Sequence, residues 1–91
     1  MVEIVWDDKF RRIFRKWARQ HPALREQFAK KIQVFEKDVF HPSLKTHSLS
    51  GILQGLYSCS ITHDQRLVFA FLDESQKSVL LIDLGTHEEV Y

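Results

Sequence analysis

The sequence has few of the residues that cross-link a chain or carry it through a membrane. Its 91 residues include a single cysteine, Cys59, so no internal disulfide can form. No apolar run approaches the roughly 20 residues of a membrane-spanning helix, and the N-terminus becomes charged too soon for a signal peptide. We therefore expect a soluble, cytoplasmic protein. Because no basic residue adjoins Cys59, it is better interpreted as a small buried hydrophobe than as a reactive thiol.

Several motifs of catalysis and cofactor binding are also missing. Three glycines and two prolines are scattered along the chain and form no glycine-rich phosphate loop. One cysteine and five separate histidines lack the close pairs that a zinc site needs. No nucleophile elbow is present either. We expect no metal and no cofactor.

The charges nearly cancel but are unevenly distributed. The formal net charge is +1, yet residues 1–47 carry eleven basic and six acidic side chains, and residues 48–91 carry two and six. A basic first half favours contact with a polyanion, whereas near neutrality argues against strong non-specific binding of nucleic acid. With 44% hydrophobic residues the chain can build one core, and we expect a single domain over residues 1–91.

The first half of the chain has the pattern of a strand and two helices. Branched apolar residues predict a strand over residues 2–6, and Asp7 and Asp8 can cap a helix after it. Apolar residues then recur at helical spacing in two stretches, first Phe10, Ile13, Phe14, Trp17 and Ala18, then Leu24, Phe28, Ile32, Phe35 and Val39. Because a proline follows His21 between them, we expect a helical hairpin that ends near Phe40.

The second half changes to the periodicity of strands. We expect strands over residues 56–62, 66–72 and 78–84, with turns at 63–65 and 73–77. The predicted order is β-α-α-β-β-β. The fold class is therefore α+β, with a two-helix hairpin packed on one face of an antiparallel sheet.

The C-terminal residues 85–91 form a candidate site. We expect Gly85 to let the backbone turn at positive φ after the last strand. The imidazole of His87 can take up or release a proton near neutral pH, and Tyr91 offers an aromatic face with a hydroxyl. A histidine just past a strand end, followed by acids and an aromatic residue, has little packing reason to be there.

Three segments carry a resemblance to a known family, namely HPSLKTHSLSG before the sheet, DQRLVFAF in its middle and DLGTHEEVY at its end. With the element order, which covers nearly the whole chain, they resemble the RelE/ParE superfamily of bacterial toxins, most closely its YafQ-like and RelE/StbE-like members. Such toxins belong to type II toxin–antitoxin pairs and typically cut mRNA in the ribosomal A site. The resemblance implies an endoribonuclease with the fold of small microbial ribonucleases.

The resemblance also implies roles for individual residues. His87 matches the histidine of the family's G-[ST]-H ending and is the candidate acid or base, and Tyr91 matches the aromatic residue beyond it. His47 and Asp64 match a histidine before an L-x-G turn and an aspartate of the central hairpin in YafQ-like members. Arg66 matches a RelE-like arginine that neutralises the phosphate. Two further candidates for contact with RNA are Lys45 and His63.

The implied reaction is phosphoryl transfer, in which a ribose 2′-hydroxyl attacks the adjacent phosphorus and expels the 5′-oxygen. Such a step needs a base for the hydroxyl, an acid for the leaving oxygen and positive charge over the phosphorane. An aromatic side chain stacked on a base aligns the attack.

The resemblance implies three partners: a cognate antitoxin encoded alongside, the ribosome and mRNA. A basic face on the first helix is the candidate antitoxin surface, with Arg11, Arg12, Arg15, Lys16 and Arg19 falling away from the apolar stripe. The alternative interpretation is an outer face that is merely solvated.

Structural alternatives stand beside these functional interpretations. His47 can bond its own loop, and Arg66 can pair with Asp64 or Asp83 across the hairpin. Asp83 stands where YafQ-like toxins usually carry a basic residue, and Ser60 where they tend to carry a histidine. The alternative function is therefore a ParE-like gyrase inhibitor, or a degenerate toxin-fold protein that only binds its antitoxin. The two histidines that precede prolines, His21 and His41, are expected in surface loops.

Overall fold

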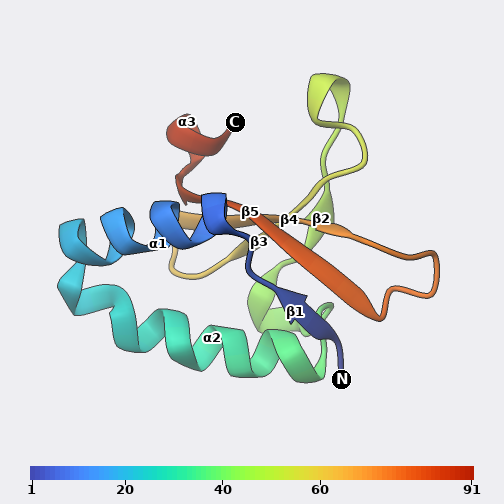
Figure 1. Ribbon diagram of the computed structural model, residues 1–91, viewed down its shortest axis with the longest axis horizontal. Coiled ribbons are helices and arrows are strands. Elements are labelled where there is room, and N and C mark those ends of the chain that lie inside the picture. The colour runs from blue at the N-terminus through green and yellow to red at the C-terminus, as the bar shows by residue number, and fades with distance from the viewer.

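The computed structural model describes residues 1–91 and has two layers, two long helices against one face of a five-stranded sheet (Figure 1). The helices are α1 (Asp8–Gln20), α2 (Arg25–Lys37) and the short α3 (His87–Val90). The strands are β1 (Glu3–Val5), β2 (His47–Ser48), β3 (Tyr57–Ser60), β4 (Gln65–Phe71) and β5 (Ser78–Thr86). The α+β class and the order of the predicted elements are confirmed.

The sheet is mixed rather than wholly antiparallel. Its strand order is β1-β5-β4-β3-β2. Strands β2 to β5 pair antiparallel, but β1 runs parallel to β5, with Ile4 opposite Val79. The two strands of a parallel pair cannot be joined by a tight hairpin, and here most of the chain separates them. Periodicity reports which face of a strand is apolar but not which strand it joins.

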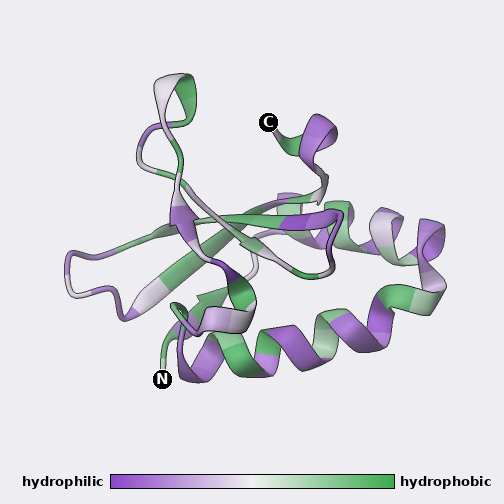
Figure 2. Ribbon diagram, turned by 180° about the vertical axis from the view of Figure 1, so that it is seen from behind, coloured by the Kyte–Doolittle hydropathy of each residue, from purple (hydrophilic) through white to green (hydrophobic).

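Helix α1 forms where its cap and its apolar stripe predict it. The Asp7 side chain accepts a hydrogen bond from the Phe10 N–H at 2.8 Å. Phe10, Trp17 and Ala18 are buried, and the half-buried Phe14 packs on the Phe28 ring of α2 at 4.7 Å between centroids. Figure 2 shows the complementary pattern, hydrophobic residues along the strands and alternating hydrophilic and hydrophobic turns along both long helices.

Helix α2 is shorter than its sequence pattern suggested. Residues Pro22–Leu24 form a separate 3-10 turn, and the helix ends at Lys37, before the predicted end at Phe40. Val39 is still buried because the chain beyond the helix folds back over the core, whereas Phe40 is 49% exposed. Side-chain burial here continues beyond the last helical residue, so the periodicity of apolar residues overestimates the length of the helix.

Two short elements were not predicted, strand β2 and helix α3. Each spans at most four residues, too few to show a period. Strand β2 is continuous with a segment that rises above the sheet, and α3 rises on the same side of the sheet from the end of β5, apart from that segment (Figure 1). Both come from segments that the sequence marked as functional, so the missed elements are those that carry the candidate site.

Gly85 does not have the role that we expected from the sequence. It lies inside β5 opposite Arg66, and only Gly51 and Gly55 among the glycines have positive φ. Its importance is steric, since a Cβ built at this position would lie 3.1 Å from Glu89 Oε1 and 3.2 Å from Glu89 Cβ. Strand β5 thus does not turn at Gly85 but continues to Thr86. Because Gly85 has no side chain, α3 can fold closely over the end of the strand.

Candidate active site

Helix α3 is fixed to the end of β5 by a capping box. Thr86 Oγ1 accepts a hydrogen bond from the Glu89 N–H at 3.3 Å, and Glu89 Oε1 accepts one from the Thr86 N–H at 2.9 Å. These two bonds satisfy backbone donors that a helix of one turn would otherwise leave open. They place His87 and Tyr91 on one side of the turn, four residues apart.

His87 and Tyr91 form a packed aromatic pair. Their rings lie 4.4 Å apart between centroids and meet edge to face at 86°. The Tyr91 hydroxyl donates a hydrogen bond to Ser58 Oγ on β3, and Ser58 is fully buried. A strand near the middle of the chain thus anchors the C-terminal residue and with it the ring against which His87 rests.

His47 lies on the neighbouring edge strand, opposite Ser58 in the register of β2 and β3. Register partners project from the same face of a sheet, so His47 and Tyr91 share the face on which Ser58 lies. His47 Nδ1 is 3.0 Å from the Lys45 carbonyl. This is the contact of His47 with its own loop that the sequence suggested as the alternative to a catalytic role. Because a carbonyl only accepts, Nδ1 must donate, and in a neutral imidazole this leaves Nε2 as a proton acceptor.

Arg66 lines a cavity of about 400 Å³ together with His87. Its other lining residues are His63, Asp64, Thr86 and Glu88. The Arg66 Nη1 group donates to the Thr62 carbonyl at 3.1 Å and to the His63 carbonyl at 2.9 Å. The hairpin turn therefore holds one arm of the guanidinium, while its remaining N–H groups are free for a phosphate.

The alternative ion pairs of Arg66 do not form. The two salt bridges in the structure join Arg11 to Asp8 and Lys30 to Glu26, both on the outer faces of helices. Asp83 accepts a hydrogen bond from the Leu84 N–H at 2.9 Å and lines a different cavity, between α1 and α3.

Two acids near the candidate site, Asp64 and Glu89, have local structural partners. Asp64 accepts a hydrogen bond from Thr62 Oγ1 at 2.9 Å within the hairpin turn. The capping hydrogen bonds from Thr86 hold the pKa of Glu89 below its ordinary value. Only Asp64 and Glu88 bring carboxylates to the cavity that contains His87.

A second cavity, of about 490 Å³, adjoins the first and shares His63 and Arg66 with it. Lys45 lines this second cavity and not the first, and neither cavity is lined by His47 or Tyr91. The predicted residues thus form two groups, one around Ser58 and one around Arg66, and His87 belongs to both.

Sequence reasoning missed three residues that shape this region. Ser58 receives the Tyr91 hydroxyl, Lys31 of α2 reaches the second cavity, and Gln65 joins the hairpin to α1 by accepting from Trp17 Nε1 at 2.8 Å. Ser58 lies inside the expected strand over residues 56–62, a signal of buried polar pairing, whereas Gln65 fell in the expected turn at 63–65 and gave no such signal. Nothing in the sequence marks Lys31 among the other lysines.

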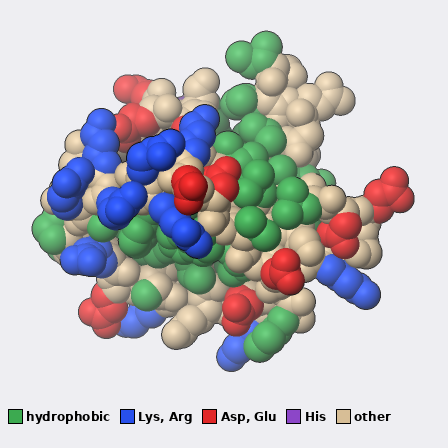
Figure 3. All heavy atoms as spheres, in the orientation of Figure 1, with side chains coloured by type: hydrophobic (Ala, Val, Ile, Leu, Met, Phe, Trp, Pro, Cys, Tyr) green, Lys and Arg blue, Asp and Glu red, His purple; other side chains and the backbone are tan.

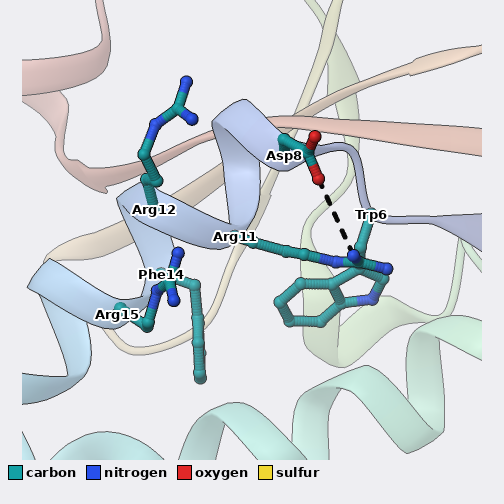
Figure 4. Close-up of a pocket in the computed structure, with 6 residues that line it drawn as sticks. All are labelled: Trp6, Asp8, Arg11, Arg12, Phe14 and Arg15. Carbon is teal, nitrogen blue, oxygen red and sulfur yellow. Dashed lines mark ion pairs between the residues drawn. The ribbon is translucent and has the colours of Figure 1, made fainter.

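Four of the five residues of the predicted basic face of α1 lie apart from these cavities, whereas Lys16 lines the cavity of Asp83 and Glu89. Figure 3 shows the Lys and Arg side chains gathered over α1. Arg11, Arg12 and Arg15 line a cavity of about 430 Å³ with Trp6, Asp8 and Phe14, where Arg11 extends along the Trp6 ring (Figure 4). Farther along the helix, Arg15 and Arg19 line a smaller cavity of about 300 Å³. Arginines beside half-buried aromatic rings suit a partner that carries both acidic and apolar groups.

Other chemistry finds little support in the structure. No group of three or more His, Cys, Asp or Glu side chains could hold a metal ion. Cys59 is 1% exposed, and burial raises the pKa of its thiol to about 12, as expected for a core residue. None of the helices has the length and apolar character needed to cross a bilayer.

The fold is shared with several solved toxins, although no family model and no curated protein matches the sequence. A metal-bound toxin from Helicobacter pylori is 23% identical with a TM-score of 0.76, and the match covers all of both chains. The YoeB/ParE toxin from Agrobacterium tumefaciens is 21% identical over 94% of this chain and 99% of that one, with a TM-score of 0.74.

The E. coli DinJ–YafQ complex gives a third match, 16% identical with a TM-score of 0.75, over 100% of this chain and 99% of the matched one. At such identities the likeness is one of architecture, and it agrees with the element order and the sheet described above. The chain therefore has the fold of the RelE/ParE-like toxins of toxin–antitoxin systems.

Proposed function

We propose that this protein is the toxin of a type II toxin–antitoxin pair and acts as an endoribonuclease on mRNA in the ribosome. The observation that carries the proposal is the position of His87. Its ring packs on Tyr91 at 4.4 Å, and it lines the same cavity as the guanidinium of Arg66. The proton carrier His87 thus contacts an aromatic ring on one side and lines a cavity with a fixed positive charge on the other.

These groups match the needs of a 2′-hydroxyl attack. His47 Nε2, left bare by the bond from Nδ1 to the Lys45 carbonyl, is suited to take the proton of the 2′-hydroxyl. His87 is suited to protonate the leaving 5′-oxygen. The free N–H groups of Arg66 stabilise the charge that develops on the phosphorane. Tyr91 offers its ring to a base.

The near-neutral charge favours action on mRNA held by the ribosome over action on free RNA. The net charge of +1 provides little general attraction to the phosphate backbone. A ribosome that presents mRNA in a fixed position supplies the orientation that this small surface lacks. We therefore expect weak activity on free RNA and stronger cleavage of translated mRNA.

An induction experiment tests the proposal. Expression of the wild-type chain alone in a bacterium should arrest growth and leave mRNA cut within translated regions. His87→Ala should relieve the arrest and lower cleavage by about 10²- to 10⁴-fold, the usual contribution of an acid or base. The control is His41→Ala, which removes a surface histidine whose ring bonds only Ser43. Normal growth with soluble wild-type protein accumulating would contradict the proposal.

A cognate antitoxin is the second part of the proposal. The basic face of α1 and the aromatic edges of Trp6 and Phe14 offer a surface for an acidic segment with apolar anchors. A disordered segment that folds on binding can cover such a helix together with part of the sheet. In the matched E. coli structure, YafQ is in complex with DinJ.

One observation favours the alternative of a toxin fold without nuclease activity. Asp64 and Glu88 place carboxylates in the cavity of His87, where they repel a phosphate. A gyrase-directed or antitoxin-binding protein tolerates these acids more easily than a nuclease. Induction of a DNA-damage response without mRNA cleavage would support gyrase as the target, and absence of both responses would support a protein that only binds its antitoxin.

A further inference from the structure

The second cavity combines three cations with no acid. It lies between α2 and the hairpin that joins β3 to β4, and Lys31, Lys45 and Arg66 reach it. The rest of its lining is Gln27, Ser43, Ser60, Ile61, Thr62 and His63, none of them acidic. Hydroxyls, an amide and a histidine thus surround three positive charges in a space of about 490 Å³.

Backbone carbonyl groups hold two of the three cations, Lys31 and Arg66. Lys31 is half-buried, and its Nζ donates to the Ser43 carbonyl at 3.1 Å. Lys45 follows the 3-10 turn Pro42–Leu44 in a left-handed conformation with φ of 52°, which is uncommon for a lysine. Arg66 is held by the Thr62 and His63 carbonyls. A carbonyl accepts a hydrogen bond without bringing a negative charge, so Lys31 and Arg66 are oriented and still have spare donors.

No carboxylate in the protein pairs with any of the three cations, because both salt bridges lie elsewhere. Their field also extends into the core beneath the cavity. The positive charges of Lys31 and Arg66 oppose the effect of burial on the pKa of the Cys59 thiol, which burial still dominates. A cavity lined by three positive side chains suits an anion that accepts hydrogen bonds from two or more of them. The oxygens of a phosphate group have the charge and the geometry to do so.

We propose that this cavity is a second phosphate-binding subsite, which holds the backbone phosphate of the nucleotide next to the scissile one. The inference rests on the proposed nuclease function for the identity of the ligand. It follows from the shared wall, because Arg66 and His63 line both this cavity and the cavity of His87. An RNA strand whose scissile phosphate lies at Arg66 then places its neighbouring phosphate between Lys31 and Lys45.

Binding of a short RNA to the full-length protein tests the subsite. The probe is a fluorescent single-stranded RNA carrying 2′-O-methyl groups, which removes the attacking hydroxyl, and its anisotropy is measured over a series of salt concentrations. Lys31→Gln should weaken binding about tenfold at low salt, as expected for a hydrogen bond to a charged group. The slope of log affinity against log salt should become shallower by about 0.7, the value for one phosphate contact on a single strand.

Lys30→Gln is the matched control. It removes the same charge from the next residue of α2, but Lys30 is exposed and pairs with Glu26 at 3.4 Å. Its affinity and slope should equal those of the wild-type protein. Both variants should keep the thermal midpoint of the wild-type protein, which excludes a folding defect as the cause.

Two further measurements separate the possible failures. Inorganic phosphate, titrated while the backbone amides of Lys31 and Lys45 are followed by NMR, should shift both resonances. The subsite is overturned if Lys31→Gln and Lys30→Gln bind RNA with equal affinity, or if the wild-type protein binds no RNA. If the amides then still respond to inorganic phosphate, the cavity binds free anions only. Failure of the nuclease function instead appears as intact mRNA in cells that express the wild-type protein.

Discussion

At the scale of single residues, Tyr91 joins two kinds of contact that substitution can separate. Its ring packs on His87, while its hydroxyl bonds the buried Ser58. The ring belongs to the proposed chemistry, since it offers a face to a base. The hydroxyl belongs to the architecture, because it ties the last residue to β3.

We expect Tyr91→Phe to retain most of the cleavage activity and Tyr91→Ala to lose it. Stacking on a base is worth about 1–3 kcal/mol, so the alanine variant should cleave roughly 5- to 150-fold more slowly. The measurement is single-turnover cleavage of mRNA on programmed ribosomes. Ser58→Ala is the control, since it removes the hydroxyl's acceptor and leaves the ring. If Tyr91→Phe is as slow as Tyr91→Ala, the hydroxyl and not the ring is the group that acts.

At the scale of elements, α3 is one turn of helix that depends on an exposed carboxylate. Hydrogen bonds from Thr86 lower the pKa of Glu89 from its ordinary value of 4.5. A carboxyl with a depressed pKa in the folded state stabilises that state above the unfolded pKa. This contribution is lost as the pH falls through the folded value.

We therefore expect α3 to detach in acid while the rest of the fold persists. As the pH falls below about 4.5, the amide resonances of residues 87–90 should move towards those of an unstructured chain before the core unfolds. Glu89→Gln should remove this pH dependence. Glu88→Gln changes an exposed neighbour outside the capping box and should preserve it. A transition of α3 that coincides with global unfolding would show that the capping box does not control the turn.

At the scale of the whole molecule, the surface divides into a basic helical face and a sheet end that carries the candidate site. The α1 arginines lie over one region of the surface in Figure 3. The two cavities near His87 and Lys31 involve the β3–β4 hairpin instead. An antitoxin can therefore bind the basic face without entering the site, or can extend from one to the other.

Reversing two charges on α1 tests whether the antitoxin uses this face. The double variant Arg12→Glu, Arg15→Glu should bind the cognate antitoxin more weakly, with the larger loss at low salt, where Coulomb interactions are least screened. Calorimetric titration at two ionic strengths measures the effect. The control is Lys30→Glu, Lys37→Glu on α2, two further exposed lysines. Unchanged affinity at low ionic strength would mean that the basic face is only solvated.

The features that the sequence predicted correctly are those that depend on local interactions. Asp7 caps α1 because its side-chain oxygen lies within reach of the Phe10 N–H, three residues later in the sequence. This interaction is local and depends on no distant segment of the chain. The apolar stripes locate both long helices, and the strands β3 to β5 follow from period and turn residues. A histidine and an aromatic residue past the last long strand indicate the candidate site.

Contacts between distant segments could not be predicted in this way and are seen only in the folded protein. The parallel pairing of β1 with β5, the contact of Tyr91 with Ser58 and the approach of Lys31 to Arg66 each join residues that lie far apart in the sequence. The role of Gly85 changed for the same reason, because its constraint comes from the packing of Glu89 and not from its own φ. Periodicity and capping record the environment of a residue, whereas its partners depend on how all the elements share one core.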